Sequence, residues 1–207
     1  MKHTLLILAV AAASTVANAG VIQSTGVGTY TFTGPGATSG TAVDVTSNPG
    51  WLDTSGGANA PAFGTLGADW IGVAANGQGV DGLYTYTYTF TSAGSTPFEF
   101  TGNWAVDNCG QILIDGVAAT GTGTSIGSVG SCVTQTSNYQ SLTAFDAVGS
   151  LVAGTTHTVQ FQIANVGANP TGFLVDTSAP EPSSVLSVLT GLGLVGAGLR
   201  RRRVSKQ

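Results

Sequence analysis

The sequence predicts an all-β protein whose central domain is an antiparallel two-sheet β-sandwich of jelly-roll type. Aromatic residues alternate with threonine over residues 83–91, where Tyr84, Tyr86 and Phe90 share one parity. Such alternation is typical of a strand with one buried and one polar face. The intervening segments are rich in Gly, Ser, Thr and Asn, as turns are, and the domain shows no convincing amphipathic helix. We expect a signal helix before this domain and a short transmembrane helix after it.

The remaining strands are predicted from alternation and from bounding Gly or Pro residues. The expected strands are residues 27–33, 41–46, 69–74, 83–91, 97–106, 111–115, 155–164 and 171–176. Residues 97–106 and 111–115 are adjacent in the chain and are expected to form a hairpin. The Gly/Thr/Ser segment 120–131 is expected to be a long loop.

Residues 1–19 have the features of a secretory signal peptide. Lys2 and His3 precede an apolar run over residues 5–13, and Ala17-Asn18-Ala19 places small residues where a signal peptidase reads them. Cleavage is expected before Gly20. The apolar run is too short to span a bilayer comfortably, so a membrane anchor is the weaker interpretation.

The charge distribution restricts the partners of the domain. All cations of the chain lie near its ends: Lys2, Arg200, Arg201, Arg202, Arg203 and Lys206. Nine carboxylates lie between Asp44 and Asp176 without a lysine or arginine among them. Nucleic acid is excluded as a partner of the domain, and an anionic membrane surface would repel it. Divalent cations and neutral glycans remain plausible partners.

The two cysteines, Cys109 and Cys132, are expected to form a disulfide, because the signal peptide directs the chain to an oxidising compartment. A metal site or a catalytic thiol is the alternative. Neither a CxxC spacing nor a nearby histidine favours it.

The domain is expected to end near Ser178, and residues 179–207 form a separate tail. Pro180-Glu181-Pro182 opens the tail, an apolar segment follows over residues 185–199, and the arginine cluster closes it. This order resembles the PEP-CTERM sorting signal of bacterial envelope proteins. The resemblance implies recognition by an exosortase-type membrane transpeptidase, removal of the tail, and export toward the outer envelope or extracellular matrix of bacteria that make exopolysaccharide. A permanent single-helix anchor is the alternative.

The central domain also resembles the galactose-binding-like sandwiches that often precede such tails. The resemblance rests on four stretches, residues 104–108, 112–116, 161–165 and 172–175. It implies a β-sandwich fold. Cys109 and Asp115 depart from the pattern of those domains.

Three motifs suggest catalysis, and each also has a structural interpretation. Ser125 lies in a G-x-S-x-G motif and is followed by Asp146 and His157 in the order of a hydrolase triad. We expect His157 instead at the margin of the core, because it shares the inward parity of its strand. Asp107 and Asp115 could serve as a glycosidase pair, although capping of turns is the simpler role. The G-x-G-x-x-G at 191–196 lies inside the apolar tail, where helix packing explains it better.

No cofactor is expected other than a calcium ion, which suits carboxylate and amide oxygens. Asp69, Asn76 and Asp81 surround a glycine-rich loop and form one candidate set. Asp107, Asn108 and Asp115 form a second candidate set.

Sugar binding would use an exposed aromatic ring with polar neighbours. Trp104 follows a buried parity, so Trp51 and Trp70, which lie near Gly/Asn/Asp segments, are expected to be the exposed indoles. Asp107 and Asn108 are the candidate polar residues.

The leading hypothesis is an exported, exosortase-processed cell-envelope or extracellular-matrix protein with a non-catalytic domain. Signal peptidase and the exosortase-type enzyme would be its partners during export, and it would contact the membrane only through its tail. An exopolysaccharide-binding module is the first alternative, and a secreted hydrolase is the second.

Overall fold

The computed structural model describes residues 24–25, 29–46, 51–52, 68–92, 97–133, 138–167 and 170–177, which belong to one compact unit, Gly20–Pro180. The predicted signal peptide at 1–19 and the predicted sorting tail at 179–207 lie outside these residues. In the described part of the chain, no helix has the length and apolar character needed to cross a bilayer.

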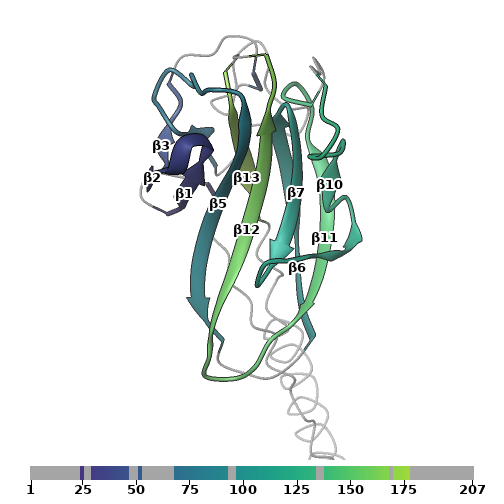
Figure 1. The fold of residues 1–207 in the computed structure, drawn as a ribbon. Helices are drawn as coiled ribbons and strands as arrows, with labels where there is room; N and C mark the ends of the chain where they lie inside the picture. The colour runs from purple at the N-terminus through teal and green to yellow at the C-terminus, as the bar shows by residue number, and fades with distance from the viewer. Residues whose placement is uncertain are drawn as a thin grey trace, which may run out of the picture. The chain divides into compact units, whose positions relative to one another are not determined.

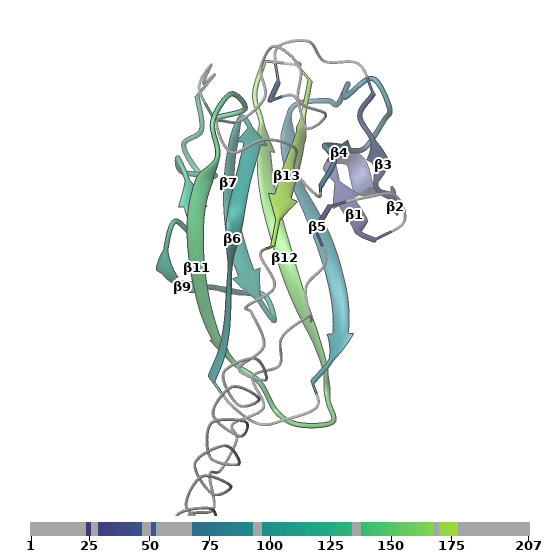
Figure 2. The ribbon, with the colours of Figure 1, turned by 180° about the vertical axis from the view of Figure 1, so that it is seen from behind.

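Two antiparallel sheets form the domain (Figures 1 and 2). The seven-stranded sheet has the order β10 (Ser125–Ile126), β7 (Cys109–Ile114), β12 (Thr156–Asn165), β5 (Gly82–Thr91), β1 (Thr31–Gly34) and β2 (Thr38–Thr41), with β8 (Val117–Ala118) paired to β7. The six-stranded sheet has the order β3 (Val43–Asp44), β4 (Ile71–Gly72), β13 (Gly172–Asp176), β6 (Pro97–Asp107), β11 (Thr143–Ser150) and β9 (Thr120–Thr122). A 3-10 turn, η1 (Pro35–Ala37), joins β1 to β2. The predicted two-sheet antiparallel fold is confirmed, and its jelly-roll type stays a prediction.

The core lies between the two sheets and is rich in aromatic rings. Tyr86 of β5 and Phe161 of β12 face Phe173 of β13, with ring centroids 4.7 and 4.9 Å apart. Trp104 of β6 lies 5.8 Å from the ring of Phe161. These side chains are fully buried, so the alternation read from the sequence places them on the inner face as predicted.

The predicted hairpin of residues 97–106 and 111–115 is wrong. These residues form strands of different sheets, because β6 pairs with β11 and β13 whereas β7 pairs with β12. The chain crosses from one sheet to the other at Asp107 and Asn108. Alternation identifies which side chains point inward, but both sheets of a sandwich have an inward face. The pattern therefore does not identify the partner strand.

The segment predicted as a long loop contains two short strands, β9 and β10. Gly121 and Gly123 have positive φ, and a Cβ at either position would collide with a backbone carbonyl oxygen of β11. These glycines therefore permit the close approach of β9 to β11. Sequence reasoning also missed β11 itself, where Phe145 and Ala147 are buried. Alanine and glycine are weak strand formers, so its alternation is faint.

The disulfide between Cys109 and Cys132 is confirmed. It links the start of β7 to the segment after β10, across a sequence separation of 23 residues. Cys109 is 2 % exposed, and a Cβ on Gly127 would lie 2.9 Å from its Sγ. The loop therefore packs closely against the bond that closes it.

The double variant Cys109→Ala/Cys132→Ala should lose roughly 3 kcal/mol of unfolding free energy, because the open chain regains the entropy that the cross-link removes. Urea denaturation followed by tryptophan fluorescence measures this difference. Unmodified protein under a reducing agent should show the same loss. An unchanged urea midpoint in both cases would contradict a stabilising cross-link.

Candidate functional site

Trp51 and Trp70 are each 4 % exposed, so the expectation that these indoles are exposed is wrong. Their ring centroids lie 4.3 Å apart, and the pair packs against Ala105 of β6 and Leu174 of β13. Ala105 and Leu174 each alternate along their strands with residues of the core between the sheets, so their side chains point away from that core. The tryptophan pair thus covers part of the outer face of the six-stranded sheet. Trp104, predicted to be buried, is buried in the core.

Asp107 and Asn108, the candidate polar residues for a ligand, are 4 % and 2 % exposed. Trp51 Nε1 donates a hydrogen bond to Asp107 Oδ2 over 2.8 Å, and Asn108 Nδ2 donates to Asp107 Oδ1 over 2.6 Å. Asn108 Oδ1 accepts from the backbone nitrogen of Val166, and Asn138 Nδ2 donates to the Asn108 carbonyl oxygen. The two residues therefore tie the crossover to three other segments.

Burial raises the pKa of Asp107 to about 6, although hydrogen bonds from Trp51 and Asn108 favour its charged form. Asp115 lies beyond the opposite end of β7, roughly 20 Å away for a six-residue strand. Carboxyl groups of glycosidases lie within about 10 Å of each other. The Asp107 and Asp115 pair therefore does not form a glycosidase site, and the second candidate calcium set is separated for the same reason.

The first candidate calcium set consists of exposed residues. Asp69, Asn76 and Asp81 are all exposed, and Asn76 Oδ1 accepts a hydrogen bond from the backbone nitrogen of Gln78 within its own turn. Burial and the nearby charge of Asp69 raise the pKa of Asp44. Across the described ranges, no group of three or more His, Cys, Asp or Glu side chains is arranged to hold a metal ion.

The residues of the predicted hydrolase triad lie on three different strands and two sheets. Ser125 lies in β10 opposite Gln111, whereas Asp146 lies in β11 of the other sheet, opposite Thr101. His157 lies in β12 and uses its ring nitrogens for other contacts. The nucleophile elbow also requires a strand-to-helix turn, and Ser125 is instead part of a strand.

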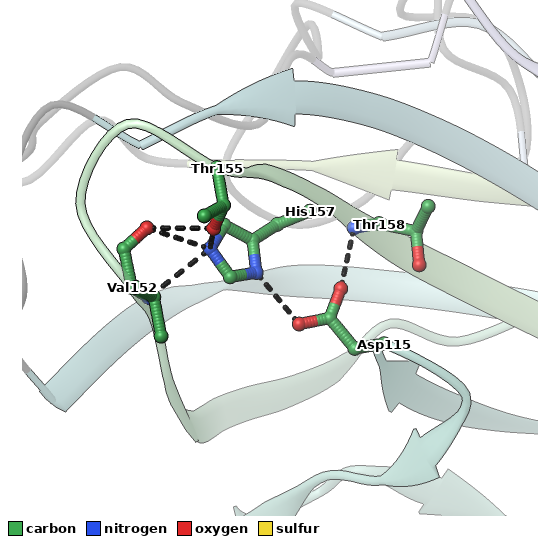
Figure 3. A network of polar contacts seen from close by, with 5 residues as sticks. All are labelled: Asp115, Val152, Thr155, His157 and Thr158. Carbon is green, nitrogen blue, oxygen red and sulfur yellow. Dashed lines mark hydrogen bonds and ion pairs between the residues drawn. The ribbon is translucent and has the colours of Figure 1, made fainter.

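His157 is 6 % exposed at the margin of the core, as predicted (Figure 3). Its Nδ1 lies 2.6 Å from Asp115 Oδ2, so the neutral ring carries its proton on Nδ1. Nε2 accepts from the backbone nitrogen of Val152 at 3.1 Å and lies 2.7 Å from Thr155 Oγ1. The carboxylate, imidazole and hydroxyl form a chain that fastens the turn after β7 to the connection between β11 and β12.

The hydrogen bond to Asp115 raises the pKa of His157, with a smaller contribution from the Val152 carbonyl oxygen, which lies 3.1 Å from Nε2 and accepts from it when the ring is protonated. For Asp115, partial burial raises the pKa, but hydrogen bonds from His157 and from the backbone nitrogen of Thr158 outweigh it and leave a lowered value. Each member of the pair thus favours the charged form of the other.

The outer face of the seven-stranded sheet presents hydroxyl and amide side chains to solvent. The strands of this sheet contain no Asp, Glu, Lys or Arg residue among those described. We call the following outward residues the threonine–glutamine face: Thr31, Thr33, Ser39, Thr41, Thr85, Thr87, Thr89, Thr91, Gln111, Ser125, Thr156, Thr158, Gln160 and Gln162. Each is half-buried or exposed.

One row of this face crosses six strands without interruption. We call it the central row, and the strand register places its members opposite one another in the order Ser39, Thr33, Thr85, Gln162, Gln111 and Ser125. Gln111 Nε2 donates a hydrogen bond to Gln162 Oε1 over 2.6 Å. Neighbouring members lie about 4.8 Å apart in the direction of pairing, so the row is about 24 Å long.

Alternation in the sequence predicts a polar face for residues 83–91 and 155–164, but it does not mark that face as a ligand site, because a sugar site is usually indicated by an exposed aromatic ring. The signal that could have indicated this face is the recurrence of Thr or Gln at every second position in both stretches. That signal does not align the two stretches, since pairing register is a property of the folded sheet.

Comparison with known proteins gives fold-level likenesses of low score. No family model and no curated protein matches the chain. A family 35 carbohydrate-binding module from an environmental isolate is 11 % identical, covers 65 % of this chain and 90 % of its own, and has a TM-score of 0.34. CBM35 from Cellvibrio japonicus Abf62 is 16 % identical, with 65 % and 91 % coverage and a TM-score of 0.33. Likenesses of this size carry no functional inference.

Trp51→Phe should destabilise the domain by about 1–3 kcal/mol at pH 7.5, because the buried Asp107 carboxylate loses a hydrogen-bond donor. The loss should be smaller at pH 5, where Asp107 with its raised pKa is mainly protonated. Urea titrations at the two pH values measure both losses.

Trp70→Phe is the matched control for this variant. Trp70 Nε1 donates to the uncharged backbone carbonyl of Leu52 over 3.0 Å, so its loss should not depend on pH in this range. An equal loss for Trp51→Phe at pH 5 and pH 7.5 would contradict the role given to the Asp107 charge.

The pair of His157 and Asp115 should stabilise the domain fully between about pH 4 and about pH 6.5, the unfolded pKa values of the two groups. The contribution falls as pH rises through the raised pKa of His157 and as pH drops through the lowered pKa of Asp115. Asp115→Asn should therefore lower Tm by a few degrees inside this window and flatten the profile above it. Thermal melts across this pH range, with Asp81→Asn as the control, measure the effect. Parallel profiles for both variants would contradict it.

Proposed function

We propose that the chain is exported, trimmed at both ends, and acts in the cell envelope or extracellular matrix as a non-catalytic β-sandwich. Signal peptidase would remove residues 1–19, and an exosortase-type transpeptidase would remove the tail near Pro180-Glu181-Pro182. The product would be an acidic domain without lysine or arginine.

The observation that carries this proposal is the placement of the cations. All six lysine and arginine residues lie in the two terminal segments, four of them as the cluster Arg200–Arg203. A positive cluster after an apolar stretch holds that end on the cytoplasmic side of a membrane. The Pro-Glu-Pro stretch before the apolar part would then face the outer side, where a processing enzyme can reach it.

Two properties of the folded domain support export and a non-catalytic role. The disulfide between Cys109 and Cys132 is typical of oxidising compartments. The side chains with catalytic potential serve structural contacts, since Asp107 binds Trp51 and Asn108, and His157 binds Asp115. A secreted hydrolase would need these groups to face a substrate together.

A second candidate function, the binding of a carbohydrate such as the exopolysaccharide of the producing cell, is favoured by the threonine–glutamine face. This face offers uncharged hydrogen-bond donors and acceptors over six strands. The other residues of these strands are uncharged as well. Neutral glycans present the complementary hydroxyl groups.

Protein recovered from the surface or medium of cells that carry an exosortase-type transpeptidase should begin at Gly20 and lack Arg200–Arg203. Intact-mass spectrometry reads both ends in one measurement. Glu181→Gln should leave the tail attached in most molecules, because it changes the acidic residue of the Pro-Glu-Pro stretch. Asp176→Asn, five residues earlier in β13, is the control and should be trimmed normally. Recovery of unmodified surface protein with its arginine cluster intact would overturn the processing proposal.

A further inference from the structure

We propose that the central row of the threonine–glutamine face binds a single chain of a neutral polysaccharide laid across the strands. This inference rests on the second candidate function proposed above and specifies its site and its class of ligand. The row consists of Ser39, Thr33, Thr85, Gln162, Gln111 and Ser125, which successive strand pairs place opposite one another.

The charge distribution of the folded domain selects a neutral ligand. All five carboxylates within the described strands belong to the six-stranded sheet: Asp44, Glu99, Asp107, Asp146 and Asp176. The seven-stranded sheet has none, and its one titratable strand residue other than tyrosine and cysteine, His157, points toward the core. An acidic polysaccharide would find no countercharge on this face and would be repelled by the net charge of the domain. A neutral chain meets neither obstacle.

The chemistry of the row selects a polyhydroxylated ligand. Threonine and serine hydroxyls both donate and accept hydrogen bonds, and each glutamine amide offers two donor hydrogens and one acceptor oxygen. Sugar hydroxyls likewise both donate and accept, so each can pair with either kind of side chain. The hydrogen bond between Gln111 and Gln162 holds the two amides next to each other on this face. The methyl groups of Thr33 and Thr85 add apolar contact for the faces of sugar rings.

The twist of the sheet favours a single polysaccharide chain as the ligand over the flat surface of a crystalline polysaccharide. Adjacent strands of a sheet rotate relative to one another by about 20–25°. The outward direction of the side chains therefore turns by roughly 100° or more along a row over six strands. A rigid flat surface could therefore touch only a few members of the row. A flexible polymer can follow the twist and contact all of them.

The central row is half-buried or exposed, whereas part of the opposite face is covered. In Figure 1 the strands β5, β12 and β7 lie toward the viewer, and Figure 2 shows β6, β11 and β13 from the other side. Trp51 and Trp70 pack on the outer side of β6 and β13. In the row next to the central row on the same side of the sheet, Cys109 lies opposite Ala164. The loop closed by the Cys109–Cys132 disulfide therefore borders the central row along one edge.

The test uses the protein recovered from cells that express the full chain, with its mass recorded. Affinity electrophoresis in gels containing dextran, galactomannan, hydroxyethylcellulose or alginate reports binding. We expect retardation by at least one of the three neutral polymers and none by alginate. The variant Thr85→Val/Gln162→Met, which keeps side-chain size, should bind at least about tenfold more weakly, because two central hydrogen-bonding groups are lost.

Thr122→Val is the control, since Thr122 is an exposed threonine of β9 in the six-stranded sheet and lies outside the threonine–glutamine face. It should bind as the unmodified protein does, and thermal melts should show that both variants fold. Absence of retardation by every neutral polymer overturns the proposal, as does retardation by alginate or equal binding by the double variant. The recorded mass tests tail removal separately, so failure of binding and failure of processing are distinguishable.

Discussion

The absence of lysine and arginine from the domain is the constraint on which the rest of the structure depends. Without these cations, buried carboxylates must be satisfied by neutral donors. The buried Asp107 accepts from an indole and an amide. The exposed Asp115 has no lysine or arginine partner either and accepts from the His157 imidazole and a backbone nitrogen. Ion pairs with permanent cations do not contribute to the stability of the domain. Aromatic packing between the sheets and one disulfide therefore carry more of it, and the tryptophan pair acquires a polar role besides its apolar one.

The same constraint makes the two outer faces of the sandwich different. The acidic side chains of the strands gather on the six-stranded sheet, where the tryptophan cluster also packs. The described strands of the seven-stranded sheet carry no charged residue, and their outer side combines uncharged polar groups with a few apolar ones such as Leu83 and Leu113. Charge within the strands is thus segregated between the two sheets, and the uncharged sheet carries the proposed ligand face.

Alternation in the sequence was sufficient to predict the fold class and the inward faces of β5 and β12. It failed for the pairing of β6 and β7, because inward parity is shared by both sheets and the Asp107-Asn108 pair is as compatible with a hairpin turn as with a crossover between sheets. The burial of Trp51 depends on an acceptor 56 residues away, a contact that no local pattern encodes. The central row was equally hidden, since its members come from six strands and meet only through register.

Register also links the core to the proposed ligand site. In β5 and β12 every outward Thr or Gln alternates with an inward Tyr, Phe, Val or His, so one period-two pattern specifies both faces. A slip of one residue between these strands would place threonine in the core and tyrosine in solvent, which costs burial energy at several positions together. The aromatic core therefore holds the strands in the one register that aligns Thr85 with Gln162. The threonine–glutamine face therefore inherits its geometry from core packing, without needing any charged group to orient it.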